Sequence, residues 1–197
     1  MKVKICGITA KTALETAIEA GADFVGFVFF EKSKRNISIE KAKVLAKIVP
    51  KTVKKVGVFV NENIENLLKI ANEIPLDIVQ LHGNETWQYC EKIPFEIIKA
   101  IKVIDGKFSQ NPDDFPNITL MFDAQISGSG EKFDWNATDF SKIKGRKFFI
   151  AGGLNPENVK EAIEYFSPFA VDVSSGVETN GQKDNDKIRE FLKNARV

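Results

Sequence analysis

The chain has 197 residues, which is enough for one domain or at most two small ones. Hydrophobic residues make up 43% of the sequence and charged residues 28%, a composition typical of a globular protein with a sizeable core. The 28 basic and 27 acidic side chains nearly cancel, so the sequence lacks the basic character expected of a nucleic-acid-binding protein.

The cysteines and the apolar runs indicate a reducing compartment. Cys6 and Cys90 are too few for a disulfide framework. The N-terminal segment does not resemble a secretory signal peptide, and no apolar run approaches the roughly 18 residues of a membrane span. We therefore expect a cytoplasmic protein that does not enter a membrane.

Short apolar runs alternate with amphipathic helical patterns along the chain. The runs predict eight strands, at residues 3–6, 24–30, 56–60, 78–81, 95–101, 118–122, 147–150 and 169–173. Between them, apolar residues at helical spacing predict helices that begin near Thr9, Ser38, Ile64, Trp87, Asn155 and Asp184. Asn155 is the expected N-cap of its helix, with Pro156 in the first helical position.

Alternating strands and helices are typical of βαβ units and a parallel sheet. Eight such units predict an α/β fold, a closed (β/α)8 TIM barrel that forms a single domain over residues 1–197. The segment between residues 101 and 118 contains Gly106, Pro112 and Pro116, so we expect a short or irregular fifth helix there. An open doubly wound sheet is the alternative architecture.

Barrel enzymes carry their active sites at the carboxyl ends of the strands. In this chain, polar residues and glycines gather at those positions: Cys6, Gly7, residues 32–35, Asn61, residues 80–83, Lys99, Asp123, Gly152, Gly153 and residues 174–176.

Glycines follow the seventh and eighth predicted strands. Gly152 and Gly153 lead into a helix, and Ser175 and Gly176 form a second turn. Glycine lets backbone N–H groups approach a phosphate, and barrel enzymes often bind phosphate with these two loops. Tight βα turns are the simpler explanation for each pair alone, but the two pairs together favour a phosphate site.

A third glycine-rich segment covers residues 127–135, after the sixth predicted strand. Its composition fits a lid or a further phosphate donor, and it fits a plain loop equally well.

Two strand-end residues are candidates for proton transfer. Cys6 ends the first strand and Asp123 ends the sixth, on the opposite side of an eight-stranded ring. An acid and a base that face each other across a cavity suit an isomerisation. The alternatives are a buried, inert thiol for Cys6 and a helix cap or salt bridge for Asp123.

Other chemistry has little support in the sequence. His82 is the only histidine, and no nucleophile elbow accompanies it. No cluster has metal-ligand spacing, and no GxGxxG motif follows a strand. We therefore expect neither a metal nor an organic cofactor.

The sequence resembles the phosphoribosylanthranilate isomerase family of tryptophan biosynthesis from end to end. The matching segments, in chain order, are residues 4–9 (KICGIT), 26–29 (GFVF), 32–35 (KSKR), 56–61 (VGVFVN), 79–83 (VQLHG), 128–130 (GSG), 133–135 (FDW), 152–159 (GGLNPENV) and 171–178 (VDVSSGVE). The resemblance implies a (β/α)8 barrel without metal or cofactor. It also implies an Amadori rearrangement of N-(5-phospho-β-D-ribosyl)anthranilate to 1-(2-carboxyphenylamino)-1-deoxy-D-ribulose 5-phosphate.

The resemblance also implies residue roles. Cys6 resembles the general base that removes the sugar C2′ proton, and Asp123 resembles the general acid that opens the furanose ring. Arg35 resembles the residue that holds the anthranilate carboxylate. Gln80 and His82 fall in a family motif and are expected to line the pocket. The phosphate cradle corresponds to Gly152, Gly153, Ser175 and Gly176.

Two other functions stay open at this point. One is isomerisation of the related aminoaldose of histidine biosynthesis, although such an enzyme is expected to use two carboxylates, and Cys6 stands at the first strand end. The other is a catalytically silent barrel that binds a phosphorylated ligand. The segment from Ala124 to Gly128 is shorter than in some family members, which leaves the lid length undetermined. The chain size is compatible with a monomer or a homodimer.

Overall fold

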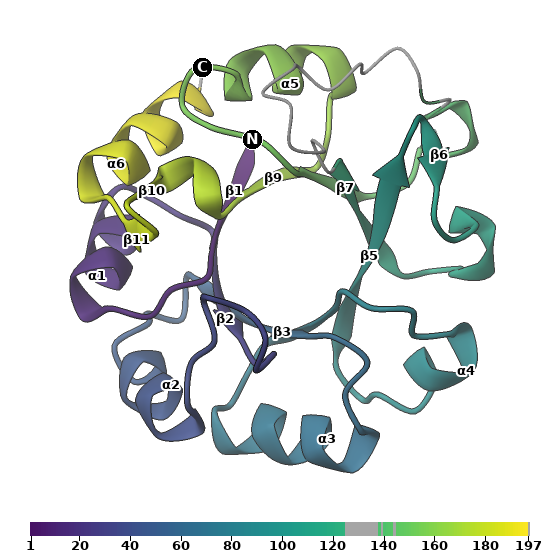
Figure 1. The fold of residues 1–197 in the computed structure, drawn as a ribbon, viewed down its shortest axis with the longest axis horizontal. Coiled ribbons are helices and arrows are strands. Elements are labelled where there is room, and N and C mark those ends of the chain that lie inside the picture. Colours follow the sequence, from purple (N-terminus) through teal and green to yellow (C-terminus); the bar gives the residue numbers. More distant parts are fainter. Residues whose placement is uncertain (125–137, 139, 144, 197) are drawn as a thin grey trace.

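The computed structural model describes residues 1–124, 138, 140–143 and 145–196. In that part of the chain, eight parallel strands form a closed ring with helices around the outside (Figure 1). Neighbouring strands follow the order β4 (Ile78–Leu81), β3 (Lys54–Phe59), β2 (Phe24–Val28), β1 (Lys2–Cys6), β9 (Ala170–Val173), β8 (Phe148–Ala151), β7 (Thr119–Ala124) and β5 (Glu96–Ile104). The ring closes because β5 pairs with β4, and the predicted (β/α)8 barrel is confirmed.

The helices cover the outer face of the barrel. They are α1 (Lys11–Glu19), α2 (Ile39–Ala46), α3 (Ile64–Glu73), α4 (Trp87–Cys90), α5 (Val159–Phe166) and α6 (Asn185–Asn194). Ser38 caps α2 by accepting a hydrogen bond from the Lys41 N–H, and Asp184 caps α6 in the same way. None of the helices in the described part of the chain is long and apolar enough to cross a membrane.

One predicted helix start is shifted by one residue and another is wrong. The N-cap of α1 is Ala10 rather than Thr9. The helix α5 begins at Val159, because the Asn155 side chain accepts hydrogen bonds from the N–H groups of Glu157 and Asn158 and holds a turn ahead of the helix.

The segment between β5 and β7 is irregular, as predicted, but it contains a hairpin that the sequence did not indicate. The chain turns at Asp105 and Gly106, both with positive φ, into the short antiparallel strand β6 (Lys107–Phe108). A single 3-10 turn, η1 (Pro112–Asp114), stands in place of a fifth helix. Near the C-terminus, η4 (Ser175–Val177) leads into a second hairpin, β10 (Glu178–Thr179) and β11 (Gln182–Lys183).

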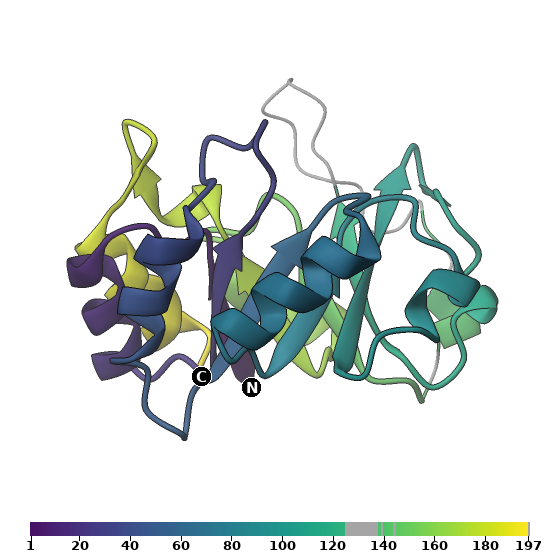
Figure 2. The same ribbon diagram turned by 90° about the horizontal axis from the view of Figure 1, so that it is seen from below.

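Side chains alternate between the barrel interior and the helix layer. The apolar interior cluster contains Phe24, Val56, Ile78, Ile98, Ala100, Met121, Phe149, Ala151 and Ala170. On β7, the outward Phe122 packs on Phe108 and Phe140, and the next residue, Asp123, turns inward. In side view, the β10–β11 and β5–β6 hairpins rise on one side of the barrel and both chain ends lie on the other (Figure 2).

Candidate active site

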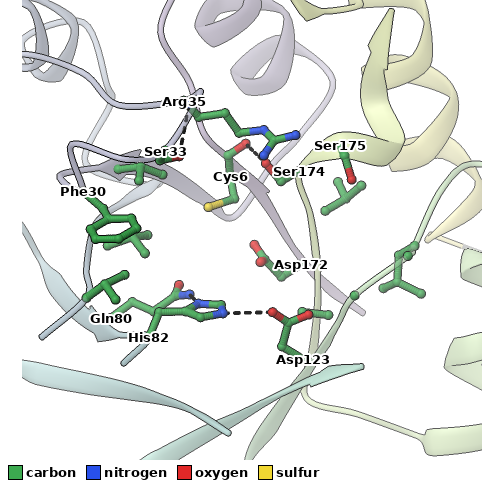
Figure 3. A pocket seen from close by; sticks show the side chains of 18 residues that line it. Cys6, Phe30, Ser33, Arg35, Gln80, His82, Asp123, Asp172, Ser174 and Ser175 are labelled. Atoms are coloured by element: carbon green, nitrogen blue, oxygen red, sulfur yellow. Dashed lines mark hydrogen bonds and ion pairs between the residues drawn. The ribbon is translucent and has the colours of Figure 1, made fainter. Parts of the chain in front are cut away.

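A cavity of about 520 Å³ opens at the carboxyl ends of the barrel strands. Its walls bring together most of the site residues predicted from the sequence: Cys6, Arg35, Gln80, His82, Asp123, Gly152, Gly153 and Ser175. Cys6 and Asp123 come from opposite sides of the ring, with Asp172 between them in the view of Figure 3. The arrangement therefore offers a thiol and a carboxyl group to one bound molecule.

Asp123 is held by the histidine that follows β4. His82 Nε2 lies 2.9 Å from Asp123 Oδ2, and Gln80 Nε2 lies 3.0 Å from His82 Nδ1 (Figure 3). An amide nitrogen only donates, so in this amide orientation His82 Nδ1 accepts and the neutral ring carries its proton on Nε2. His82 then donates to Asp123 Oδ2, while Asp123 Oδ1 has no hydrogen-bond partner among the described residues.

Gln80 is fixed from a second direction. Its Nε2 also lies 3.3 Å from the sulfur of Met121 in the barrel interior. Its buried Oε1 has no hydrogen-bond partner among the described residues. Such an unpaired buried oxygen is uncommon in proteins.

Cys6 lies on the other side of the cavity and is only 6% exposed. Burial raises the pKa of its thiol above the ordinary value. The charge of Lys4 opposes this shift, Asp172 adds to it, and Lys183 opposes it. The thiol of the ligand-free protein is thus mostly protonated at neutral pH.

Arg35 reaches the cavity from the loop between β2 and α2. Its Nε and Nη2 donate to the two carboxylate oxygens of Glu178 at 2.6 and 2.7 Å. Hydrogen bonding to this carboxylate raises the pKa of Arg35. Lys183 donates to the same carboxylate at 2.6 Å. Arg35 Nη1 has no partner among the described residues, so one edge of the guanidinium is available to an anion.

The loops after β8 and β9 form the third wall. Gly152 and Gly153 have φ values of +88° and +65°, a region that side chains disfavour. Ser175 lines the cavity, but Gly176 is not among the lining residues. A Cβ at Gly176 would collide with the carbonyl oxygen of Leu154, so this glycine lets the two loops pack against each other.

The family model described as N-(5'-phosphoribosyl)anthranilate (PRA) isomerase matches residues 3–194 of the chain. The chain belongs to this isomerase family. The N-(5'-phosphoribosyl)anthranilate isomerase of Listeria monocytogenes serotype 4a (strain HCC23) is 49% identical over 200 residues, covering 100% of this chain and 98% of the relative.

Solved structures of the family match the whole fold. A phosphoribosyl anthranilate isomerase in complex with reduced 1-(o-carboxyphenylamino)-1-deoxyribulose 5-phosphate has a TM-score of 0.82 at 41% identity, covering 100% of this chain and 98% of that one. A structure of monomers of the dimeric phosphoribosylanthranilate isomerase from Thermotoga maritima has the same TM-score, identity and coverage.

Two strand-end residues flagged in the sequence lie outside the cavity of this family member. Lys99 is on the outer face of β5, where its ammonium group contacts Glu85 at 3.1 Å. Asn61 joins the loops after β3 and β4, with its N–H donating to Glu85 and its Oδ1 accepting from Asn84. The segment of residues 127–135, considered above as a lid, lies outside the described residues.

Several polar residues around the cavity were not identified from the sequence. Alternation along β1 turns Lys4 to the same face as Cys6, a signal that could have identified it. The same alternation on β9 turns Asp172 to the face of Ser174, two residues later, and could have identified Asp172 as well. Glu178 and Lys183 had no local signal, because only the hairpin brings them to Arg35. Among the described residues, no three His, Cys, Asp or Glu side chains gather in an arrangement that could hold a metal.

Proposed function

We propose that this member of the family catalyses the Amadori rearrangement of N-(5-phospho-β-D-ribosyl)anthranilate to 1-(2-carboxyphenylamino)-1-deoxy-D-ribulose 5-phosphate in tryptophan biosynthesis, with Cys6 as general base and Asp123 as general acid. The observation that carries the assignment of these two residues is their presence on opposite walls of one cavity. An aminoaldose bound between them would meet the acid on one side and the base on the other.

The proposed reaction begins at Asp123. Its carboxyl group gives a proton to the ring oxygen, the C1′–O bond breaks toward that oxygen, and the nitrogen lone pair forms an iminium with C1′. The Cys6 thiolate then removes the C2′ proton, and the electrons of the C–H bond form the C1′–C2′ double bond of an enolamine. Tautomerisation of this enolamine gives the aminoketose. His82 keeps Asp123 Oδ2 occupied, so Oδ1 is the oxygen that carries the proton given to the substrate.

The ends of the substrate have matching groups in the cavity. The free edge of Arg35 suits the anthranilate carboxylate, to which a guanidinium donates well. The backbone N–H groups of Gly152 and Gly153, together with Ser175 and the adjacent Gly176, suit the phosphate. Gln80 and His82 line the space between these two ends.

The loss of phosphoribosylanthranilate fluorescence tests the proposal directly. Cys6→Ala and Asp123→Asn should each lower kcat by about 10²–10⁴-fold, the usual contribution of general acid–base catalysis. Cys90→Ala is the matched control, because Cys90 is buried on α4 outside the cavity, and it should retain normal turnover.

Near-normal turnover in either active-site variant would assign that proton transfer to another residue. The aminoaldose phosphate of histidine biosynthesis, supplied alone, should not be consumed. Consumption of that compound in place of phosphoribosylanthranilate, or binding of either without turnover, would refute the proposal.

We further propose that the protein works in the cytoplasm, and that its assembly is a monomer or a homodimer. Sedimentation velocity at micromolar concentration distinguishes these two states, and a larger species would contradict the proposal.

A further inference from the structure

A fully buried ammonium group lies inside the barrel, beneath the thiol. Lys4 is 0% exposed, and its Nζ donates to Asp172 Oδ1 at 2.8 Å. Lys4 and Asp172 are register partners on β1 and β9, and Cys6 follows Lys4 on the same face of β1. The three side chains therefore form one group in the barrel interior (Figure 3 shows Cys6 and Asp172).

The space between the thiol and the ammonium is kept open by a glycine. A Cβ placed on Gly26, the register partner of Cys6 on β2, would lie 2.9 Å from Cys6 Sγ and 3.2 Å from Lys4 Nζ. Both atoms therefore converge on one point. The ammonium has three N–H donors and one oxygen acceptor among the described residues, so it has a donor to spare for the sulfur.

Stability alone does not account for this charged pair. Its surroundings in the interior are apolar side chains, such as Phe24, the register partner of Lys4 on β2. Buried ion pairs are often no more stabilising than apolar side chains of similar volume, because desolvation offsets the attraction between the charges. A charged pair that lies next to the proposed general base is better explained by its electric field at the sulfur.

We propose that Lys4 is a positioning residue for the general base: its ammonium group stabilises the thiolate of Cys6, and Asp172 limits this effect by sharing the ammonium. The inference rests on the proposed function for the role of the thiolate in turnover. The effect of Lys4 and Asp172 on ionisation of the Cys6 thiol can be measured without substrate.

The titration directions agree with the geometry. Burial would lower the pKa of Lys4, but the charges of Asp172 and Cys6 outweigh it and raise the pKa, so the ammonium stays charged at neutral pH. Lys4 lowers the pKa of the Cys6 thiol and Asp172 raises it. The other cations near the thiol are Lys183, from β11, and Arg35, from the loop after β2.

The test is the pH profile of Cys6 alkylation by iodoacetamide between pH 6 and 10, read from the Cys6 peptide by mass spectrometry. Lys4→Met keeps the shape of the side chain and removes its charge, and it should lower the alkylation rate at pH 8 by about tenfold or more, since an opposite charge at close range changes a pKa by about one to three. Asp172→Asn should change the rate in the opposite direction.

Lys4→Met leaves the Asp172 carboxylate buried without its partner, so far-UV circular dichroism must confirm that it folds. If it does not, Asp172→Asn and the double variant Lys4→Met/Asp172→Asn provide the same comparison, because they differ only in the Lys4 charge. The double variant should react more slowly. An unchanged profile after loss of Lys4, or slower alkylation in both single variants, would overturn the proposal.

Turnover measured on the same variants separates this inference from the proposed function. The acid limb of kcat/KM should move to higher pH in Lys4→Met together with the alkylation profile, which a purely structural role would not produce. A thiol profile that moves in a protein without isomerase activity would refute the function and leave the electrostatic role of Lys4 intact. Normal turnover with an unchanged alkylation profile would support the proposed function and refute the electrostatic role of Lys4.

Discussion

A buried carboxylate on the outer side of the barrel joins the loop after β3 to the loop after β4, which carries His82. Glu85 is 2% exposed at its side chain, and its oxygens accept hydrogen bonds from the N–H groups of Asn61 at 2.8 Å and Gly83 at 3.0 Å. Its ion-pair partner, Lys99, is 0% exposed, with an N–O distance of 3.1 Å. The substitution Glu85→Gln keeps the shape of this residue and leaves the ammonium of Lys99 buried without a counter-charge.

The expected cost follows from that burial. Removing one partner of a buried ion pair destabilises a protein by about 3–5 kcal/mol, because the remaining charge stays desolvated. For a chain of this size, each kcal/mol lowers Tm by about 2–4 °C, so a decrease of about 6–20 °C is expected. The matched control is Glu73→Gln, which breaks an ion pair to Lys43 with the same 3.1 Å distance but side chains that are 35% and 45% exposed. Its cost should stay below about 1 kcal/mol.

The pH dependence supplies a second signature. Burial lowers the pKa of Lys99, and the charge of Glu85 opposes that shift, so Glu85→Gln lowers this pKa further. The unfolded state then binds more protons than the folded state below the ordinary lysine pKa of 10.5, and stability rises with pH in that window. The deficit of Glu85→Gln relative to wild type should therefore be largest near pH 7 and shrink toward pH 10.

Equilibrium unfolding in urea, followed by far-UV circular dichroism at pH 7 and pH 9.5, measures both quantities. A Glu85→Gln variant within about 1 kcal/mol of wild type at pH 7 would refute the buried-charge argument. A deficit that grows with pH would refute the assignment of the cost to Lys99.

Three further predictions concern single positions. Gly26→Ala places a methyl group 2.9 Å from Cys6 Sγ and 3.2 Å from the backbone Cα of Cys6, so it should lower kcat by about 10²-fold and cost about 1–3 kcal/mol of stability, because small displacements of reacting groups are costly and the packed interior has no room for the methyl group. Gly176→Ala collides with the Leu154 carbonyl and should raise KM and cost about 1–3 kcal/mol in thermal unfolding. Burial alone would raise the pKa of Glu178, but its basic partners lower it, so it stabilises the fold above pH 4.5 and loses this contribution as pH falls; acid titration of Glu178→Gln should show a smaller loss of stability.

Patterns within short stretches of the sequence predicted the barrel strands and the residues at the strand ends. Alternating apolar runs located all eight barrel strands, and the strand-end rule brought Cys6 and Asp123 to one cavity. The start of α5 was misplaced because an Asn–Pro pair fits a helix N-terminus and also the turn that precedes one here.

Contacts between distant segments could not be predicted in this way. Arg35 and Glu178 lie 143 positions apart in the sequence, and His82 and Asp123 lie 41 apart. Each pair forms only after the ring closes, and a single sequence contains no signal for side chains that meet through closure. The family resemblance could assign roles to Arg35 and Asp123, but not the partners that orient them.

Ring closure also separates the electrostatic control of the two proposed proton-transfer groups. The charges that act on the Cys6 thiol come from β1, β9, the β2–α2 loop and β11, and three of the four are cations: Lys4, Lys183 and Arg35, against Asp172. Asp123 is instead held by the Gln80–His82 pair that extends from β4. Because these groups occupy opposite walls, the cavity places a cationic environment around the sulfur, which must carry negative charge before it takes the C2′ proton, and a hydrogen-bond donor where a carboxylate remains after proton transfer. The environment of Cys6 thus favours the thiolate that accepts a proton, and that of Asp123 favours the carboxylate left after a proton is given, so the substrate is the shared element that couples the acid step to the base step.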